Sequence, residues 1–296
     1  MISKTFRIGL MIVIASLALS SAAEAATCSN ASLSGTYGFV TGGTNIDGAP
    51  NVHVSQLTFD SATGTYTGES TASEGGAIIT TSLTATYAVA SNCTVTATVT
   101  TGGQSQNLAF VVTPAGFLAV DQKTGVTSQG FGVKQGSPIC TNAGVEGSFG
   151  FEATGVLVAG APVTGPVAFI GELKLTVDPS GEGVIGGHVA GSEDGTILTF
   201  AEEPVTGSYT VDTDCRGRAT IRLKGLSEMH FSLVVVDCGK EMLAIETDTN
   251  TVVSGTLVKG RDEMEEGLPA NANNTDSVTG RGADSAMARS PLGSGS

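Results

Sequence analysis

The sequence predicts an all-β protein with two tandem antiparallel β-barrel domains of about eight strands each, with a sandwich as the alternative closure. Three observations predict this class. Apolar and polar residues alternate along many short segments, which is the period of a strand with one buried face. The composition is rich in Gly, Thr and Val and contains no Trp. One unit of about 110 to 120 residues occurs twice.

The N-terminal segment has the pattern of a secretory signal peptide. Lys4 and Arg7 precede an uncharged run over residues 8–19, and Ala23, Glu24 and Ala25 form a small-residue cleavage pattern. The run is shorter than the roughly 20 residues that cross a hydrocarbon core. We therefore expect residues 1–25 to be removed after Ala25, and the mature chain to be periplasmic or extracellular without inserting into the membrane.

The internal repeat appears as three ordered blocks. Cys28 and the segment 33–39 (LSGTYGF) recur 112 residues later as Cys140 and 145–151 (VEGSFGF). Residues 84–93 recur at 206–215, an offset of 122, and residues 117–120 recur at 242–245, an offset of 125. Growing offsets indicate duplication followed by loop insertion. The predicted organisation is a signal peptide (1–25), repeat one (26–135), a linker (136–139), repeat two (140–260) and a disordered acidic tail (261–296).

Strand periodicity is clearest in repeat two. Ala219, Ile221 and Leu223 share one face of a predicted strand, and the next segment alternates in the same way from residue 229 to residue 235. Turn residues separate such runs at the spacing of about 8 to 12 residues that sandwiches and barrels have. Each copy holds eight or nine strand candidates, and eight are enough to close a barrel and remove exposed edges.

Four of the cysteines that follow the predicted signal peptide occupy equivalent positions in the two copies. In an exported protein this symmetry suggests one disulfide in each copy. The expected pairs are Cys28 with Cys93 and Cys140 with Cys215. Cys238 is left over. His230 is the nearest candidate base in sequence, but an unpaired cysteine is more often inert than catalytic.

Known catalytic and cofactor patterns are missing from the sequence. His53, His188 and His230 have no metal-ligand spacing, and no nucleophile elbow, phosphate loop or dinucleotide glycine pattern occurs. Paired acidic residues such as Glu193 and Asp194 are expected to be solvated. We therefore predict no cofactor and no metal, and an enzyme is disfavoured. The formal charge of −14 makes nucleic acid an improbable partner.

One basic stripe stands out. Its members have the same parity and would share one face of a strand. They are Arg216, Arg218, Arg222 and Lys224. The functional interpretation is a site for an anionic ligand or an acidic polysaccharide. The structural interpretation, which we favour, is pairing with acidic residues of adjacent strands, for which Asp212, Glu228 and Glu246 are available.

The repeat resembles a group of exported bacterial repeat proteins of uncharacterised function. Their pattern combines LxGxYGF, GxYxVxxDCxG, a GKE turn and VVSGT. The second copy carries it as residues 206–217, 237–241 and 251–256, whereas the first copy departs from it, for example with Asn92 in place of the Asp. The resemblance implies a barrel like that of allene oxide cyclase, and a shared barrel does not imply a shared activity.

Three functions remain open. The first is a non-catalytic binding module for a small apolar ligand or a polysaccharide, and the second is a structural or adhesive spacer of the envelope. The third and least favoured is a cyclase-like or isomerase-like enzyme. The feature that separates the first two is the barrel interior. An open interior favours a ligand, and an interior filled by its own side chains favours a spacer.

Overall fold

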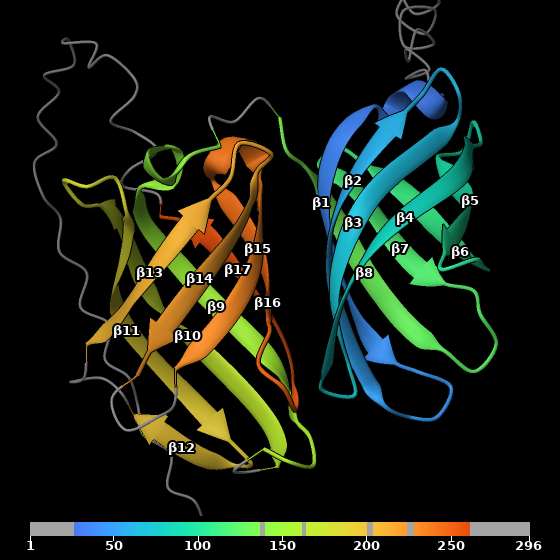
Figure 1. The fold of residues 1–296 in the computed structure, drawn as a ribbon. Helices are drawn as coiled ribbons and strands as arrows, with labels where there is room; N and C mark the ends of the chain where they lie inside the picture. Colours follow the sequence, from blue (N-terminus) through green and yellow to red (C-terminus); the bar gives the residue numbers. More distant parts are fainter. Residues whose placement is uncertain (1–26, 137–139, 162–163, 200–203, 224–227, 261–296) are drawn as a thin grey trace, which may run out of the picture.

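The structure, a computed structural model, describes residues 27–136, 140–161, 164–199, 204–223 and 228–260. The predicted signal peptide, the tail from residue 261 and residues 137–139 of the predicted linker lie outside the described residues. Within them the chain is all-β and forms two barrels that stand side by side (Figure 1). The predicted fold class is confirmed, and both copies close as barrels instead of opening into sandwiches.

The first barrel, called barrel 1 below, contains β1–β8, and each strand pairs antiparallel with its neighbours in chain order until β8 returns to β1. The strands are β1 (Gly35–Thr44), β2 (Pro50–Asp60), β3 (Thr65–Glu74), β4 (Ala77–Val89), β5 (Thr94–Thr101), β6 (Gln104–Thr113), β7 (Gly116–Asp121) and β8 (Thr127–Lys134). Short turns join them, so the topology is the predicted meander.

The second barrel, called barrel 2, contains β9–β17 and closes because β11 pairs with β10 on one side and with β12 and β13 on the other. Its strands are β9 (Gly147–Leu157), β10 (Gly165–Val177), β11 (Gly183–Glu193), β12 (Thr196–Thr199), β13 (Val205–Val211), β14 (Arg216–Arg222), β15 (Met229–Val236), β16 (Glu241–Glu246) and β17 (Thr251–Lys259). β12 and β13 together take the place that β4 has in barrel 1, so barrel 2 also has eight strand positions.

A disulfide-tied 3-10 turn plugs the same end of each barrel. The turns are η2 (Asn30–Leu33) and η3 (Asn142–Val145), and Leu33 and Val145 are fully buried beneath them. Disulfides join Cys28 to Cys93 and Cys140 to Cys215, which are the pairs that the repeat suggests. Each bridge connects the segment before the plug to a turn between two strands, β4 and β5 in barrel 1 and β13 and β14 in barrel 2.

The plugs also use the same hydrogen bonds in both copies. Asn30 Oδ1 accepts the Val89 backbone N–H at 2.9 Å, and Asn142 Oδ1 accepts the Val211 N–H at 2.8 Å. The Tyr209 hydroxyl donates to the Asn142 carbonyl at 3.0 Å. Since Asn30 and Asn142 each lie two residues after the first cysteine of their copy, they extend the sequence repeat into the structure.

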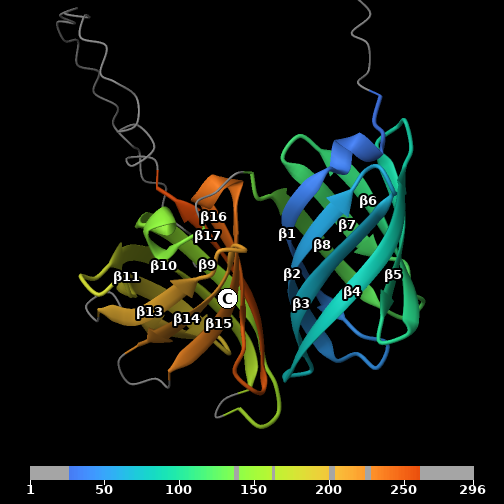
Figure 2. The same cartoon turned by 45° about the horizontal axis from the view of Figure 1, so that its top comes forward.

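An apolar seam joins the two barrels through their outer faces. Strands β1–β3 of barrel 1 face β15–β17 of barrel 2 (Figure 2). Side chains from both barrels form one buried cluster in this seam. Its fully packed members are Val40, Val52, Val54, Val234, Val236, Leu243, Ile245 and Val252. β15 and β16 are thus buried on both faces, which explains the continuous apolar runs at 233–236 and 242–245.

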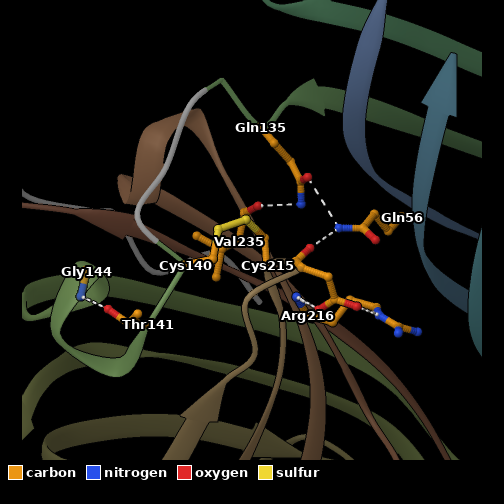
Figure 3. Close-up of a disulfide and its surroundings, with 9 residues drawn as sticks. Gln56, Gln135, Cys140, Thr141, Gly144, Cys215, Arg216 and Val235 are labelled. Atoms are coloured by element: carbon orange, nitrogen blue, oxygen red, sulfur yellow. Dashed lines mark hydrogen bonds and ion pairs between the residues drawn. A yellow bond between two sulfur atoms is a disulfide. The ribbon is translucent and has the colours of Figure 1, made fainter. Parts of the chain in front are cut away.

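Polar contacts close the rim of the seam beside the Cys140–Cys215 disulfide (Figure 3). Gln135 is buried and donates from Nε2 to the Val235 carbonyl at 3.0 Å. Gln56 Nε2 donates to Gln135 Oε1 and to the carbonyl of Asp214. Arg216 pairs with Asp214 of its own barrel and with Glu69 of barrel 1. The seam therefore combines apolar burial with paired polar groups.

Candidate ligand cavity in barrel 1

Barrel 1 contains an open cavity of about 450 Å³ at the end opposite its plug. The plugged half is filled by a cluster with seven aromatic rings, in which Phe59 packs on Tyr66 with ring centroids 4.7 Å apart and Phe110 stacks on Phe117 at 5.0 Å. Phe39 and Tyr66 belong to this cluster and also line the cavity, so they form its floor. The volume lies in the range of about 300 to 1,000 Å³ that small-molecule sites occupy.

Polar side chains form one wall of the cavity, on strands β2 and β3. Asn51, His53 and Ser55 have the parity of Leu57 and Phe59 and therefore point into the lumen. The Ser55 hydroxyl donates to the hydroxyl of Ser70 at 2.9 Å. Polar residues at core parity are the signal in the sequence for this wall, and they follow no metal-ligand spacing.

His53 lies between Asn51 and Ser55 in this wall and is half-buried. Burial lowers the pKa of its imidazole, and the neighbouring charges of Glu74 and Asp121 raise it in part. The imidazole is therefore neutral at pH 7. No described residue makes a hydrogen bond to the His53 ring. A neutral imidazole has one donor and one acceptor nitrogen, so His53 offers both to a bound molecule.

Asn51 carries an unpaired acceptor in the same wall. The side chain is only 2% exposed. Its Nδ2 donates to Asn45 Oδ1 at 2.7 Å, while its Oδ1 has no hydrogen-bond partner among the described residues. An unpaired buried acceptor costs about 1 to 3 kcal/mol. A donor supplied by a ligand or by water would remove this cost.

The mouth of the cavity is acidic. Asp47, Glu74 and Asp121 line it together with one basic residue, Lys123. Asp121 accepts hydrogen bonds from the Lys123 backbone N–H at 2.7 Å and from the Gln106 side chain. Glu74 has neither an ion pair nor a side-chain hydrogen bond within the described part of the chain. Ile46 is 70% exposed at the rim, which adds an apolar edge to this entrance.

Barrel 2 has no comparable space in its described interior. Two voids of about 20 and 10 Å³ lie among its core side chains. Each is large enough for about one water molecule. A shallow depression of about 710 Å³ lies on the outer face of barrel 2, over Ile170 and Val258, and its form is that of an open surface. The two copies therefore differ in the property that separates a ligand site from a packed core.

Five matched lumen positions explain the difference. Pairing with the duplicated strands sets the equivalence: His53 lies opposite Thr41, as Phe169 lies opposite Ala153. At each position barrel 1 has a polar residue and barrel 2 an apolar one that belongs to its core. The pairs are Asn51 and Val167, His53 and Phe169, Ser70 and Val189, Gln106 and Met229, and Ser128 and Val253.

The members of the basic stripe have different surroundings in the structure. Arg216 is engaged at the seam with Glu69 and Asp214. Arg222 pairs with Glu228 at 2.9 Å, one of the acidic partners expected from the sequence. Arg218 is exposed on β14, and Lys224 lies outside the described residues. The side chains of Asp212 and Glu246 form no ion pair with the three described members of the stripe. Among the described members of the stripe, only Arg218 has no acidic partner.

The remaining candidates lie apart from one another. Cys238 is an exposed free thiol beside Gly136, and His230 pairs with Asp248 at 2.8 Å between Nδ1 and Oδ1. No group of three or more His, Cys, Asp or Glu side chains among the described residues could hold a metal ion. No helix among the described residues combines the length and the apolar character that a membrane crossing requires.

Comparison with known proteins adds little to this geometry. No family model and no curated protein matches the chain. Similar solved structures include a Nostoc punctiforme protein of unknown function from the DUF3598 family (9% identity, TM-score 0.25, covering 78% of this chain and 97% of that chain). A second is a β-barrel-like protein of domain of unknown function DUF1849 from Brucella abortus (12% identity, TM-score 0.20, covering 77% and 97%). At these TM-scores neither likeness carries an argument about function.

Proposed function

We propose that the chain is a non-catalytic binding protein that holds one small molecule with an apolar body in the lumen of barrel 1. The observation that carries the proposal is the open cavity of about 450 Å³ in barrel 1, beside a filled interior in barrel 2. An enclosed apolar floor with a few convergent polar groups is the usual form of a small-molecule site.

A purely structural role explains the cavity poorly. Barrel 2 shows that the same barrel can form with a packed interior, since Phe169 and Val167 occupy the places of His53 and Asn51. Filling barrel 1 in the same way would add buried apolar area and stability. A polar, open lumen lowers stability, and a ligand that uses the lumen accounts for it.

Barrel 2 supports the second candidate function, a structural spacer, for its own half of the molecule. Its core is closed, and the part of its outer face formed by β15–β17 packs against barrel 1. In the proposed protein, barrel 2 holds barrel 1 through the seam and contributes no lumen site. An exported location, for which the two disulfides and the predicted signal peptide argue, would make the ligand an extracytoplasmic one.

The test is titration with N-phenyl-1-naphthylamine, a neutral apolar probe whose emission rises in an apolar site. The chain lacks Trp, so the protein background is low. We expect saturable 1:1 binding to the full mature chain. Absence of saturable binding, together with no retained small molecule in native mass spectrometry, would overturn the proposal.

A lumen-blocking variant locates the probe. In barrel 2, Phe169 fits because Gly191 lies opposite, where an added Cβ would approach the Phe169 ring to 2.5 Å. The double variant His53→Phe with Ala72→Gly copies this pair into barrel 1. We expect it to fold and to lose probe binding. Ala88→Phe, on the exposed outer face of β4, is the matched control and should bind the probe as the unmodified chain does.

A further inference from the structure

The polar groups of the cavity define the ligand more closely than its apolar floor does. Resting on the proposed binding function, we propose that barrel 1 takes an amphipathic amine, with its apolar body on the Phe39 and Tyr66 floor and its protonated nitrogen at the acidic mouth. The nitrogen would donate hydrogen bonds to Glu74 and to acceptors of the β2 wall.

The unpaired groups of the site are mainly acceptors. Asn51 Oδ1 is buried without a partner, and the Glu74 side chain has none among the described residues. Glu74 lies directly across the ladder from Asn51, so both acceptors lie at one side of the mouth. A ligand head rich in N–H donors satisfies them, whereas a carboxylate or a phosphate brings only further acceptors.

Charge at the mouth acts in the same direction. Asp47, Glu74 and Asp121 face one basic side chain, that of Lys123. Asp47 and Glu74 are exposed and Asp121 is half-buried, so the mouth attracts a cation through partly solvated charges whose effect salt reduces. The formal charge of −14 of the whole chain also favours the approach of cations over anions. A fatty-acid carboxylate would meet repulsion at the place where its head would lie.

The neutral state of His53 fits the same ligand. Burial lowers the pKa of this imidazole, so it adds no positive charge that would oppose an ammonium group at pH 7. Its unpaired ring nitrogens supply a further acceptor deeper in the lumen. A hydroxyl or second amine along the ligand body could use this acceptor together with Ser55 and Ser70.

The test compares three probes of equal chain length: 1-decylamine, 1-decanol and decanoate. Each compound is titrated against the complex of the mature chain with N-phenyl-1-naphthylamine at pH 7 and low salt, below the compound's own micelle concentration, and displacement of the probe is measured. We expect the amine to bind at least about tenfold more tightly than decanoate, with the alcohol between them. High salt should reduce the gap. Decanoate binding as tightly as the amine would overturn the inference.

Two variants separate a mouth effect from general attraction to an acidic protein. Glu74→Gln should weaken decylamine binding about fivefold and leave decanol binding unchanged. Lys123→Gln should tighten decylamine binding. Equal decylamine affinity in both variants would overturn the inference. Decylamine binding that persists in the His53→Phe, Ala72→Gly variant would place the amine outside the lumen and overturn it as well.

The outcomes also distinguish this inference from the proposed function. If the neutral probe and decanol bind in the lumen but the amine has no advantage, the binding function stands and the amine class falls. If neither the neutral probe nor any decyl compound binds the lumen, the binding function itself falls. Circular dichroism and thermal melting of each variant establish that a loss of binding is not a loss of fold.

Discussion

Glu246 shows how the two copies use one position differently. It is the counterpart of Asp121, because Asp121 ends β7 and Glu246 ends the equivalent strand β16. Each lies four residues after a core residue, Phe117 in one copy and Met242 in the other. Asp121 lies at the open mouth of barrel 1, bonded to Gln106. Glu246 is buried inside barrel 2. A carboxyl group is therefore tolerated in both copies, in a polar mouth in one and in an apolar core in the other.

The environment of Glu246 sets its protonation. Burial among apolar side chains raises the pKa of Glu246 to about 7, with Asp248 adding to the rise and His230 opposing it. Because the folded state holds a proton that the unfolded chain releases above about pH 4.5, stability falls as pH rises from about 4.5 to about 7. Above pH 7 the loss from this group is complete.

Glu246→Gln should remove that pH dependence. The variant carries no ionisable group at position 246, so it should be more stable than the unmodified chain at pH 8, by up to about 3 kcal/mol. At pH 5 the difference should shrink, because the folded unmodified protein is then mostly neutral at this site. Urea unfolding followed by circular dichroism at both pH values measures the effect. An equal difference at pH 5 and pH 8 would contradict it.

At the scale of elements, the plugs of the two copies share their parts one for one. Each combines a 3-10 turn, a buried apolar residue, an Asn side chain that accepts a strand N–H, and a disulfide to the fourth turn of the barrel. Cys93 and Cys215 both adopt a left-handed backbone, with φ of 68° and 70°. The same local geometry recurs because the same residues recur, and the sequence repeat predicted the cysteine pairs for that reason.

Removing either disulfide should lower the stability of the protein without changing the cavity of barrel 1. The bridges span 65 and 75 residues, and loops of this size make a disulfide contribute roughly 2 to 4 kcal/mol through the unfolded state. We expect Cys28→Ser with Cys93→Ser to lower the melting temperature and to leave N-phenyl-1-naphthylamine binding intact at 20 °C. The plug and the mouth are at opposite ends of barrel 1, and Cys140→Ser with Cys215→Ser serves as the matched comparison in barrel 2.

At the scale of the whole molecule, the seam makes the two barrels one body. Gly38 on β1 is central to it, because a Cβ at this position would approach Val236 Cγ1 to 2.4 Å and Val234 Cγ1 to 2.9 Å. Gly150 is the equivalent residue of β9, on a face that no other barrel covers. A Cβ there would have its nearest neighbour at 3.8 Å.

Gly38→Val and Gly150→Val therefore form a matched pair. The first should overpack the seam, separate the barrels and destabilise the protein by about 1 to 3 kcal/mol. The second should have little effect. Small-angle scattering should show a larger radius of gyration for Gly38→Val alone. Equal behaviour of the two variants would mean that the seam does not hold the barrels together in solution.

The sequence by itself determined the all-β class, the duplication and the cysteine pairs. These follow from local periodicity and from residues that recur in the same order in both copies, such as Tyr37 with Phe149 and Cys93 with Cys215. Only the tertiary structure decided which lumen is open and which outer face is covered. Alternation places His53 and Phe169 inward alike, and whether inward side chains meet across a barrel depends on partners that are distant in the chain.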